Sequence, residues 1–166
     1  MSGWEEFFVA QVGAAAVLAG LIFVGISVNL RQLLARRLVS RGAWVCLLSL
    51  VEVLVVSSYM LVPEQPRDVL GAEVGLTGLA CWIVITIATF TQLRPSGQEG
   101  FAGGQKWYVK IAIVLLSQLI TVPFVVAGAM LFLHIDSGVY WLVPGILSAL
   151  PYSLYMGWVL TVEVNR

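Results

Sequence analysis

The sequence is poor in charge. Charged residues occupy 11% of its 166 positions and hydrophobic residues 60%, whereas a typical soluble domain carries about 25% charged residues. The mean hydropathy is +0.95, which leaves no room for a separate soluble domain. The formal net charge is zero, so overall charge gives no reason to expect nucleic acid as a partner.

Cysteine and histidine are also scarce. Cys46 and Cys81 are the two cysteines, and they lie at different depths of separate apolar runs. We therefore expect neither a disulfide nor a zinc site. His134 is the sole histidine, so the chain lacks a set of metal or haem ligands. With no nucleophile–base set and no cofactor motif, we expect no cofactor and no enzyme activity.

Long apolar runs dominate the chain instead. A helix that crosses a bilayer needs about 20 apolar residues, and five runs meet that length. They cover approximately residues 7–30, 42–62, 69–93, 107–132 and 139–162. Each should be helical, because a segment in lipid must satisfy its own backbone groups. The sequence thus predicts an all-α, polytopic membrane protein with one transmembrane domain over residues 1–166.

The basic residues are distributed unevenly between the two sides of these runs. Eight of the nine fall on one side, and Arg67 falls on the other. The eight are Arg31, Arg36, Arg37, Arg41, Arg94, Lys106, Lys110 and Arg166. Cytoplasmic connections carry an excess of lysine and arginine. We therefore predict an outside N-terminus and a cytoplasmic C-terminus, in the plasma (inner) membrane.

Glu52 is the midpoint of the second run, with ten residues on either side. A carboxylate at that depth costs about 2.5–3.5 kcal/mol and is functional by default. A low dielectric disfavours the charged form, so this position is compatible with a neutral Glu52. Ser49 and Tyr59 share its helix face, and Gln118, near mid-depth of the fourth run, is the expected protein partner. These four residues form a candidate ion or proton site; a static polar seam is the alternative.

Prolines interrupt the fourth and fifth runs. Pro123 leaves the carbonyl of Leu119 without its usual donor and should kink the helix. Pro151, near mid-depth, frees the carbonyl of Leu147 beside Tyr152. Freed carbonyls at the midplane can form an ion or substrate site, although such kinks also occur without one. Pro123, Leu147, Pro151 and Tyr152 are therefore a second candidate site.

Small residues are spaced four apart in two runs. The pairs are Ala15 with Ala19, Ala16 with Gly20, and Gly71 with Gly75. Such faces let helix backbones approach closely in lipid. We expect them to pack helices, either within one subunit or, for the first run, in a homo-oligomer interface or pore lining.

The opening stretch, WEEFFVAQVGAAAVLAGLIFVGISVNLRQLL, carries a resemblance. It is similar to small uncharacterised actinobacterial membrane proteins, which are sometimes labelled modulators of the FtsH protease. The likeness covers the first run, the arginine turn and, weakly, the second run with its end near VPEQP. It implies a bacterial inner-membrane protein and assigns no functional residue.

Two functions follow from these features. The first is a homo-oligomeric ion or proton channel or transport protein, since five helices are few for an enclosed pathway and symmetry could supply one. The alternative is a non-catalytic accessory or regulatory subunit of a larger membrane complex. The expected partners are the lipid bilayer and either further copies of the chain or another membrane protein.

Overall fold

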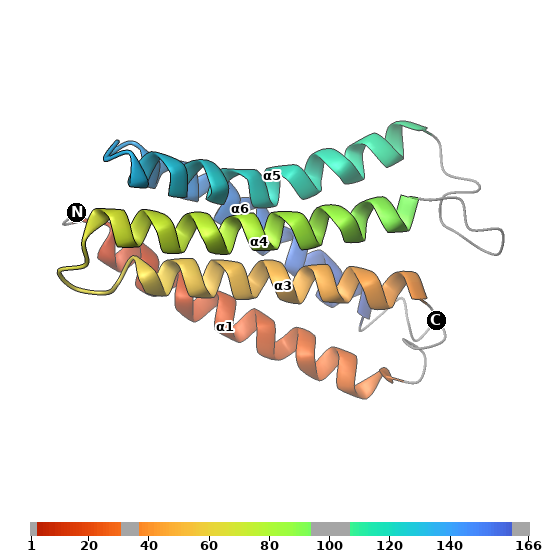
Figure 1. The fold of residues 1–166 in the computed structure, drawn as a ribbon. Coiled ribbons are helices and arrows are strands. Elements are labelled where there is room, and N and C mark those ends of the chain that lie inside the picture. Colours follow the sequence, from red (N-terminus) through yellow and green to blue (C-terminus); the bar gives the residue numbers. More distant parts are fainter. Residues whose placement is uncertain (1–2, 31–36, 94–106, 161–166) are drawn as a thin grey trace.

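The computed structural model describes residues 3–30, 37–93 and 107–160, and these form an all-helical bundle without strands (Figure 1). The helices are α1 (Glu5–Val28), α3 (Arg37–Tyr59), α4 (Arg67–Leu93), α5 (Trp107–Phe132) and α6 (Gly138–Trp158). All five are long and apolar enough to cross a membrane. The expectation of an all-α protein with five such helices is therefore confirmed.

The helix ends differ from the sequence estimate in places. The described part of α3 begins at Arg37, before the apolar run that starts at Gly42, and the α-helical part of α6 is assigned to Trp158. Hydropathy marks where a segment becomes apolar, whereas a helix continues through polar residues until a turn interrupts it. Arg37 and Arg41 are polar residues of this kind, and the described part of α3 includes both.

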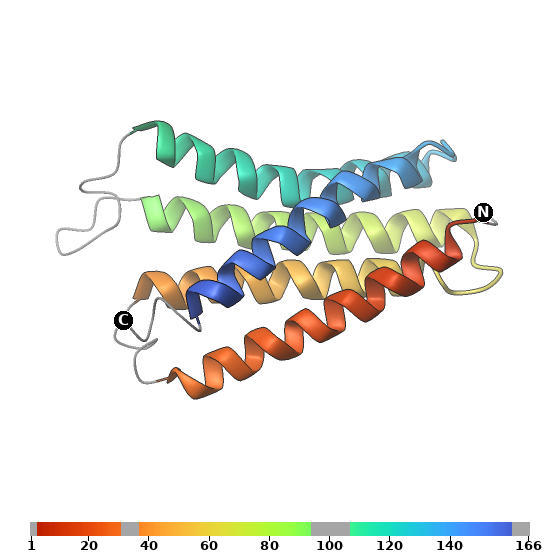
Figure 2. The same ribbon diagram turned by 180° about the vertical axis from the view of Figure 1, so that it is seen from behind.

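α3 lies at the centre of the bundle. It packs against α1, α4 and α6, while α5 packs against α4 and α6, and α1 also contacts α6. Figure 1 shows α3 between α1 and α4, and Figure 2 shows α1 and α6 along the opposite side. Any side chain on α3 that points away from the surface is therefore surrounded by other helices.

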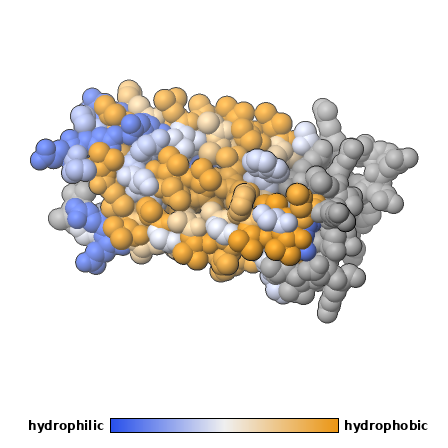
Figure 3. All heavy atoms as spheres, turned by 90° about the horizontal axis from the view of Figure 1, so that it is seen from below, coloured by the Kyte–Doolittle hydropathy of each residue, from blue (hydrophilic) through white to orange (hydrophobic). Residues whose placement is uncertain are grey.

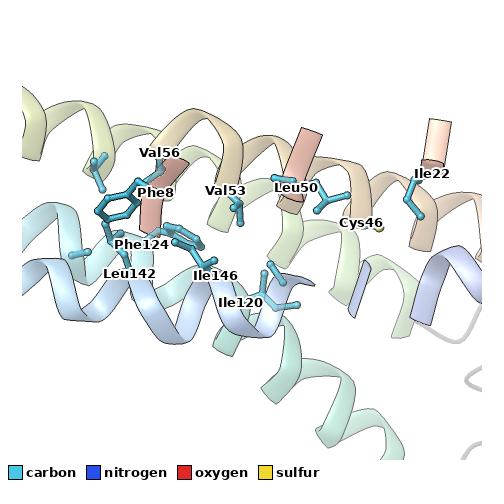
Figure 4. Close-up of a cluster of buried hydrophobic side chains, with 14 of the residues drawn as sticks. Phe8, Ile22, Cys46, Leu50, Val53, Val56, Ile120, Phe124, Leu142 and Ile146 are labelled. Atoms are coloured by element: carbon cyan, nitrogen blue, oxygen red, sulfur yellow. The ribbon is translucent and has the colours of Figure 1, made fainter. Parts of the chain in front are cut away.

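The core between the helices is apolar and continuous. Phe8 of α1 and Phe124 of α5 are at most 1% exposed and lie among aliphatic side chains of α3 and α6 (Figure 4). The aliphatic members include Leu50, Val53, Leu142 and Ile146. Every helix contributes to this core, so the bundle is one packed unit.

The outer surface is also apolar along the middle of the helices. Phe23, Leu76 and Leu115 are each more than 60% exposed, and Figure 3 shows a broad hydrophobic band beside a hydrophilic end. A soluble protein rarely exposes an apolar surface of this extent. The fold is that of a multi-pass membrane protein, with aromatic contacts such as Trp4 to Tyr140 at the hydrophilic end.

Glycines bring α4 and α5 into backbone contact. A Cβ atom at Gly71 would lie 2.6 Å from Cα of Phe132, and one at Gly78 would lie 3.0 Å from the carbonyl carbon of Phe124. A Cβ atom at Gly128 would overlap the backbone of Gly75. The structure thus places Gly71 and Gly75 in the contact between two helices of one subunit.

The small residues of α1 divide between two faces. Ala15 is fully buried, and Ala19 packs against the core. Ala16 and Gly20 lie on the exposed side, and a Cβ atom at Gly20 would meet nothing within 4 Å. Packing inside the subunit therefore uses the first pair and leaves the second on the outer surface.

Ion pairs join the two turns at the hydrophilic end of the bundle. Arg67 at the start of α4 pairs with Asp136 at 2.6 Å, and Asp68 pairs with His134 at 3.1 Å. The partners come from the α5–α6 turn. All four side chains are largely exposed, so these pairs contribute little stability.

We expect Gly128→Ala to destabilise the bundle by about 1–3 kcal/mol, because the added methyl group overlaps the backbone of Gly75 and forces α4 and α5 apart. Gly20→Ala is the matched control and should be neutral or stabilising by up to about 1 kcal/mol, since its methyl group has open space. Thermal unfolding of both variants in mild detergent measures the difference. Equal unfolding midpoints would contradict the glycine contact.

Candidate functional site

Glu52 lies inside the subunit. It belongs to α3, seven residues before the helix ends at Tyr59, and is 0% exposed. Val45, Ser49 and Val56 occupy the same sector of the helix, and all three are buried. The carboxyl group therefore points into the bundle and not toward its outer surface.

The Glu52 carboxyl is unsatisfied within the described part of the chain. Among the described residues, neither of its two oxygen atoms has a hydrogen-bond partner. An isolated ionised carboxylate in an apolar interior costs so much that the group takes up a proton instead. A neutral carboxyl without a partner still costs about 1–3 kcal/mol, so Glu52 lowers the stability of the fold.

Ser49 and Tyr59 do not bond to Glu52. The Ser49 hydroxyl donates to the carbonyl of Cys46 at 2.8 Å, on its own helix, as serines in apolar helices commonly do. Tyr59 is partly buried and packs against the apolar core. Although the three residues share a helix face, no direct hydrogen bond connects the other two to the carboxyl.

Gln118 has other partners, contrary to our expectation. Its Oε1 accepts a hydrogen bond from Trp82 Nε1 at 2.7 Å, and its Nε2 donates to the Thr86 hydroxyl at 3.3 Å. Both partners belong to α4. Gln118 is therefore not the hydrogen-bond partner of Glu52, because the rotation of α5 directs the amide to polar groups of α4.

The proline in α5 has a local compensation. Pro123 removes the donor that would normally bond to the carbonyl of Leu119, and α5 changes direction near its middle (Figure 1). The hydroxyl oxygen of Ser148 in α6 lies 3.3 Å from that carbonyl oxygen and 2.9 Å from the carbonyl oxygen of Gly145, so its one hydrogen is shared between the two acceptors. The Leu119 carbonyl that Pro123 leaves without a donor thus forms a contact between α5 and α6.

The second proline lies on the outside of the bundle. Pro151 and Leu147 are exposed, and Leu147 is 54% exposed. Tyr152 is partly buried and packs against the core. Because Glu52 is enclosed, Gln118 bonds to α4 and Pro151 is exposed, the structure does not gather Glu52, Gln118 and the Pro151 break into one site.

Sequence reasoning missed two features near this site. Cys81 of α4 lies close enough to Glu52 to interact with it electrostatically. Ser57 of α3 is fully buried, and its hydroxyl has no partner among the described residues. Cys81 could have been suggested by its position near the middle of the third run. Nothing in the sequence distinguishes Ser57 from Ser58, whose hydroxyl donates to the carbonyl of Leu54.

Comparison of the chain with protein-family models, curated proteins and solved structures finds no match. The interpretation of the site therefore depends on its own geometry. That geometry is one fully buried carboxyl without a hydrogen-bond partner among the described residues.

We expect Glu52→Met to raise the free energy of unfolding by about 1–3 kcal/mol, because an apolar side chain of similar length replaces an unpartnered carboxyl. Gln118→Met should lower it by a similar amount, since Trp82 and Thr86 would lose their partner. Chemical denaturation in mild detergent measures both changes. Loss of stability in Glu52→Met would show that the carboxyl has a bound partner.

Proposed function

We propose that this protein is a small multi-pass membrane transport protein in which Glu52 binds and releases a proton. The observation that carries the proposal is the fully enclosed, unpartnered carboxyl within a membrane-length helix. Ionisable residues inside membrane segments are costly and commonly mark ion or proton pathways. Glu52 lowers the stability of the bundle, and a functional role would explain why a carboxyl occupies this position.

A proton suits this environment better than a metal cation. A proton needs one carboxyl, whereas a hard cation such as Ca²⁺ takes 6–8 oxygen ligands. The side chains beside Glu52 on its helix face are two valines and a serine whose hydroxyl already donates to Cys46. The enclosed position also favours a pathway through each subunit, even if the protein assembles as a homo-oligomer.

The orientation is part of the same proposal. The eight basic residues on one side support an outside N-terminus and a cytoplasmic C-terminus in a bacterial inner membrane. Under this orientation α3 runs from the cytoplasmic side to the outside, and Glu52 lies seven residues before its outer end. Compartment-specific reporters fused to each terminus test the orientation.

The exposed face of α1 favours a second candidate, an accessory or regulatory subunit of a larger membrane complex. Gly13 and Gly20 both have open space where a Cβ atom would lie, and Ala16 lies exposed between them. Such a face can accept a helix of another protein at close range. The resemblance of the first run to proteins labelled FtsH modulators is consistent with this alternative.

We expect proteoliposomes containing the protein to dissipate an imposed pH gradient, and Glu52→Gln to abolish that flux. The amide keeps the shape of the side chain but cannot release a proton at neutral pH. Glu6→Gln, which removes an exposed carboxyl at the start of α1, should conduct like the wild type. A pH-sensitive dye trapped inside the vesicles measures the rate.

Equal flux through Glu52→Gln and the wild type would exclude the role proposed for Glu52. If the wild type itself conducts no protons, mild-detergent purification distinguishes the remaining candidate. A stoichiometric partner that is lost when Gly13 and Gly20 are replaced by leucine would support the accessory role. A uniform homo-oligomer without another protein would oppose it.

A further inference from the structure

Ser153 of α6 begins a row of side chains with exchangeable hydrogens that leads to Glu52. It is fully buried, and its hydroxyl donates to the carbonyl of Ala149 at 2.8 Å. The same hydroxyl is close enough to the thiol of Cys46 on α3 for a side-chain hydrogen bond. Because a hydroxyl group can donate to one neighbour and accept from another, Ser153 connects α6 with the buried face of α3.

Cys46, Ser49 and Glu52 continue this row along α3. They follow one another at intervals of three residues, and side chains at that spacing are neighbours on a helix surface. All three are fully buried, and together they extend about 9 Å along the helix axis. The Ser49 hydroxyl is bonded to the Cys46 carbonyl, and rotation of the flexible glutamate side chain brings its carboxyl to Ser49. We name Ser153, Cys46 and Ser49 the groove row.

The groove row opens at Ser153 into a groove between α1 and α6, which lie side by side in Figure 2. The groove has a volume of about 480 Å³, and Ser153 and Asn29 are among its lining residues. Val28 and Trp158, the last residues of two membrane-length helices, also line it. The groove therefore reaches the boundary between membrane and water. Since a water molecule takes up about 30 Å³, there is room for several between that boundary and Ser153.

A second row lies on α4 and leads from Glu52 to the hydrophilic end of the bundle. Cys81 is buried and lies close enough to Glu52 to interact with it electrostatically. Thr77 and Glu73 precede Cys81 at intervals of four residues, the spacing at which side chains meet along one helix face. Gln65 of the α3–α4 turn donates to the Glu73 carboxyl, so this row ends at the turn. We name Cys81, Thr77 and Glu73 the α4 row.

We infer that protons reach and leave Glu52 through these two rows, the groove row on one side of the membrane and the α4 row on the other. The inference rests on the proposed role of Glu52 and adds the route to it. On α3 itself, Val56 is the buried side chain one turn beyond Glu52, and it has no exchangeable hydrogen. The α4 row therefore supplies the half of the route that α3 lacks.

Each transfer moves one proton and leaves the relaying group unchanged. A hydronium ion in the groove gives a proton to the Ser153 oxygen and becomes water, while the hydrogen of Ser153 passes to the sulfur of Cys46. The thiol hydrogen passes to the Ser49 oxygen, and the Ser49 hydrogen passes to the Glu52 carboxylate. The α4 row repeats these exchanges from the Glu52 carboxyl to the Glu73 carboxylate, which releases the proton to water.

Proton flux through proteoliposomes tests whether the two rows act in series. Cys46→Val breaks the groove row and Thr77→Val breaks the α4 row, with little change in side-chain size. We expect each variant alone to lower the flux about 100-fold, the lower end of what a positioned proton-transfer group contributes. Ser58→Ala and Thr89→Val are the matched controls, because each removes a hydroxyl of α3 or α4 that bonds to its own helix outside the rows. Both controls should conduct like the wild type.

Hydrogen–deuterium exchange of the Glu52 carboxyl tests the same rows in parallel. Infrared spectroscopy in D₂O follows the carbonyl band of the protonated carboxyl, which is assigned by its loss in Glu52→Gln. Either single variant leaves one row intact and should exchange at the wild-type rate, whereas Cys46→Val with Thr77→Val should exchange about 100-fold more slowly. Cys46→Ser with Thr77→Ser keeps an exchangeable hydrogen at both positions and should restore the wild-type rate.

The two measurements separate failure of the rows from failure of the proposed function. If Glu52→Gln abolishes the flux but Cys46→Val and Thr77→Val conduct like the wild type, the rows are wrong and the role of Glu52 stands. If the wild type conducts no protons, the proposed function fails, and an unchanged exchange rate in the double valine variant overturns the rows as well. Equal loss of flux in Ser58→Ala and Thr89→Val would show a general loss of packing and would also overturn the inference.

Discussion

The structure depends on one constraint: between the ends of its helices, a polar group must find its partner within the protein, because lipid offers none. Hydroxyl groups find a partner within their own helix: Thr89 and Thr121 each donate to a carbonyl four residues earlier. Gln118 of α5 finds its partners on another helix, where it hydrogen-bonds to Trp82 and Thr86 of α4. Glu52 does not meet it, and this contrast makes its carboxyl the strongest functional candidate.

The sequence predicted the helices well and their rotation poorly. Apolar length along the chain determines which segments can form membrane-length helices, so the five helices could be predicted directly. The face on which a side chain lies depends on how each helix turns toward its neighbours. Gln118 and Leu147 both lie within predicted apolar runs, but Gln118 bonds to α4 and Leu147 lies on the outer surface.

The spacing of small residues likewise does not predict which helix face packs against a neighbour. Gly71 with Gly75 and Ala16 with Gly20 follow one pattern in the sequence, yet the first pair contacts α5 and the second lies exposed. The spacing indicates that the backbone of another helix can approach closely, but it does not identify which helix does so. Packing of α1 uses the face of Phe8, Ala15 and Ile22, which leaves the Gly20 face outside.

The packing also indicates where an enclosed carboxyl could gain access to a proton. The contact between α4 and α5 is made by backbone against backbone, and Ser148 bonds α6 to the Leu119 carbonyl of α5. These three helices are thus held together by contacts that leave little freedom. Side chains fill the space around α3, among them Val53 and Val56, and side chains can repack at lower cost than backbones in contact. If Glu52 exchanges a proton as we propose, this packing favours movement of α3 against its neighbours while α4 and α5 stay paired.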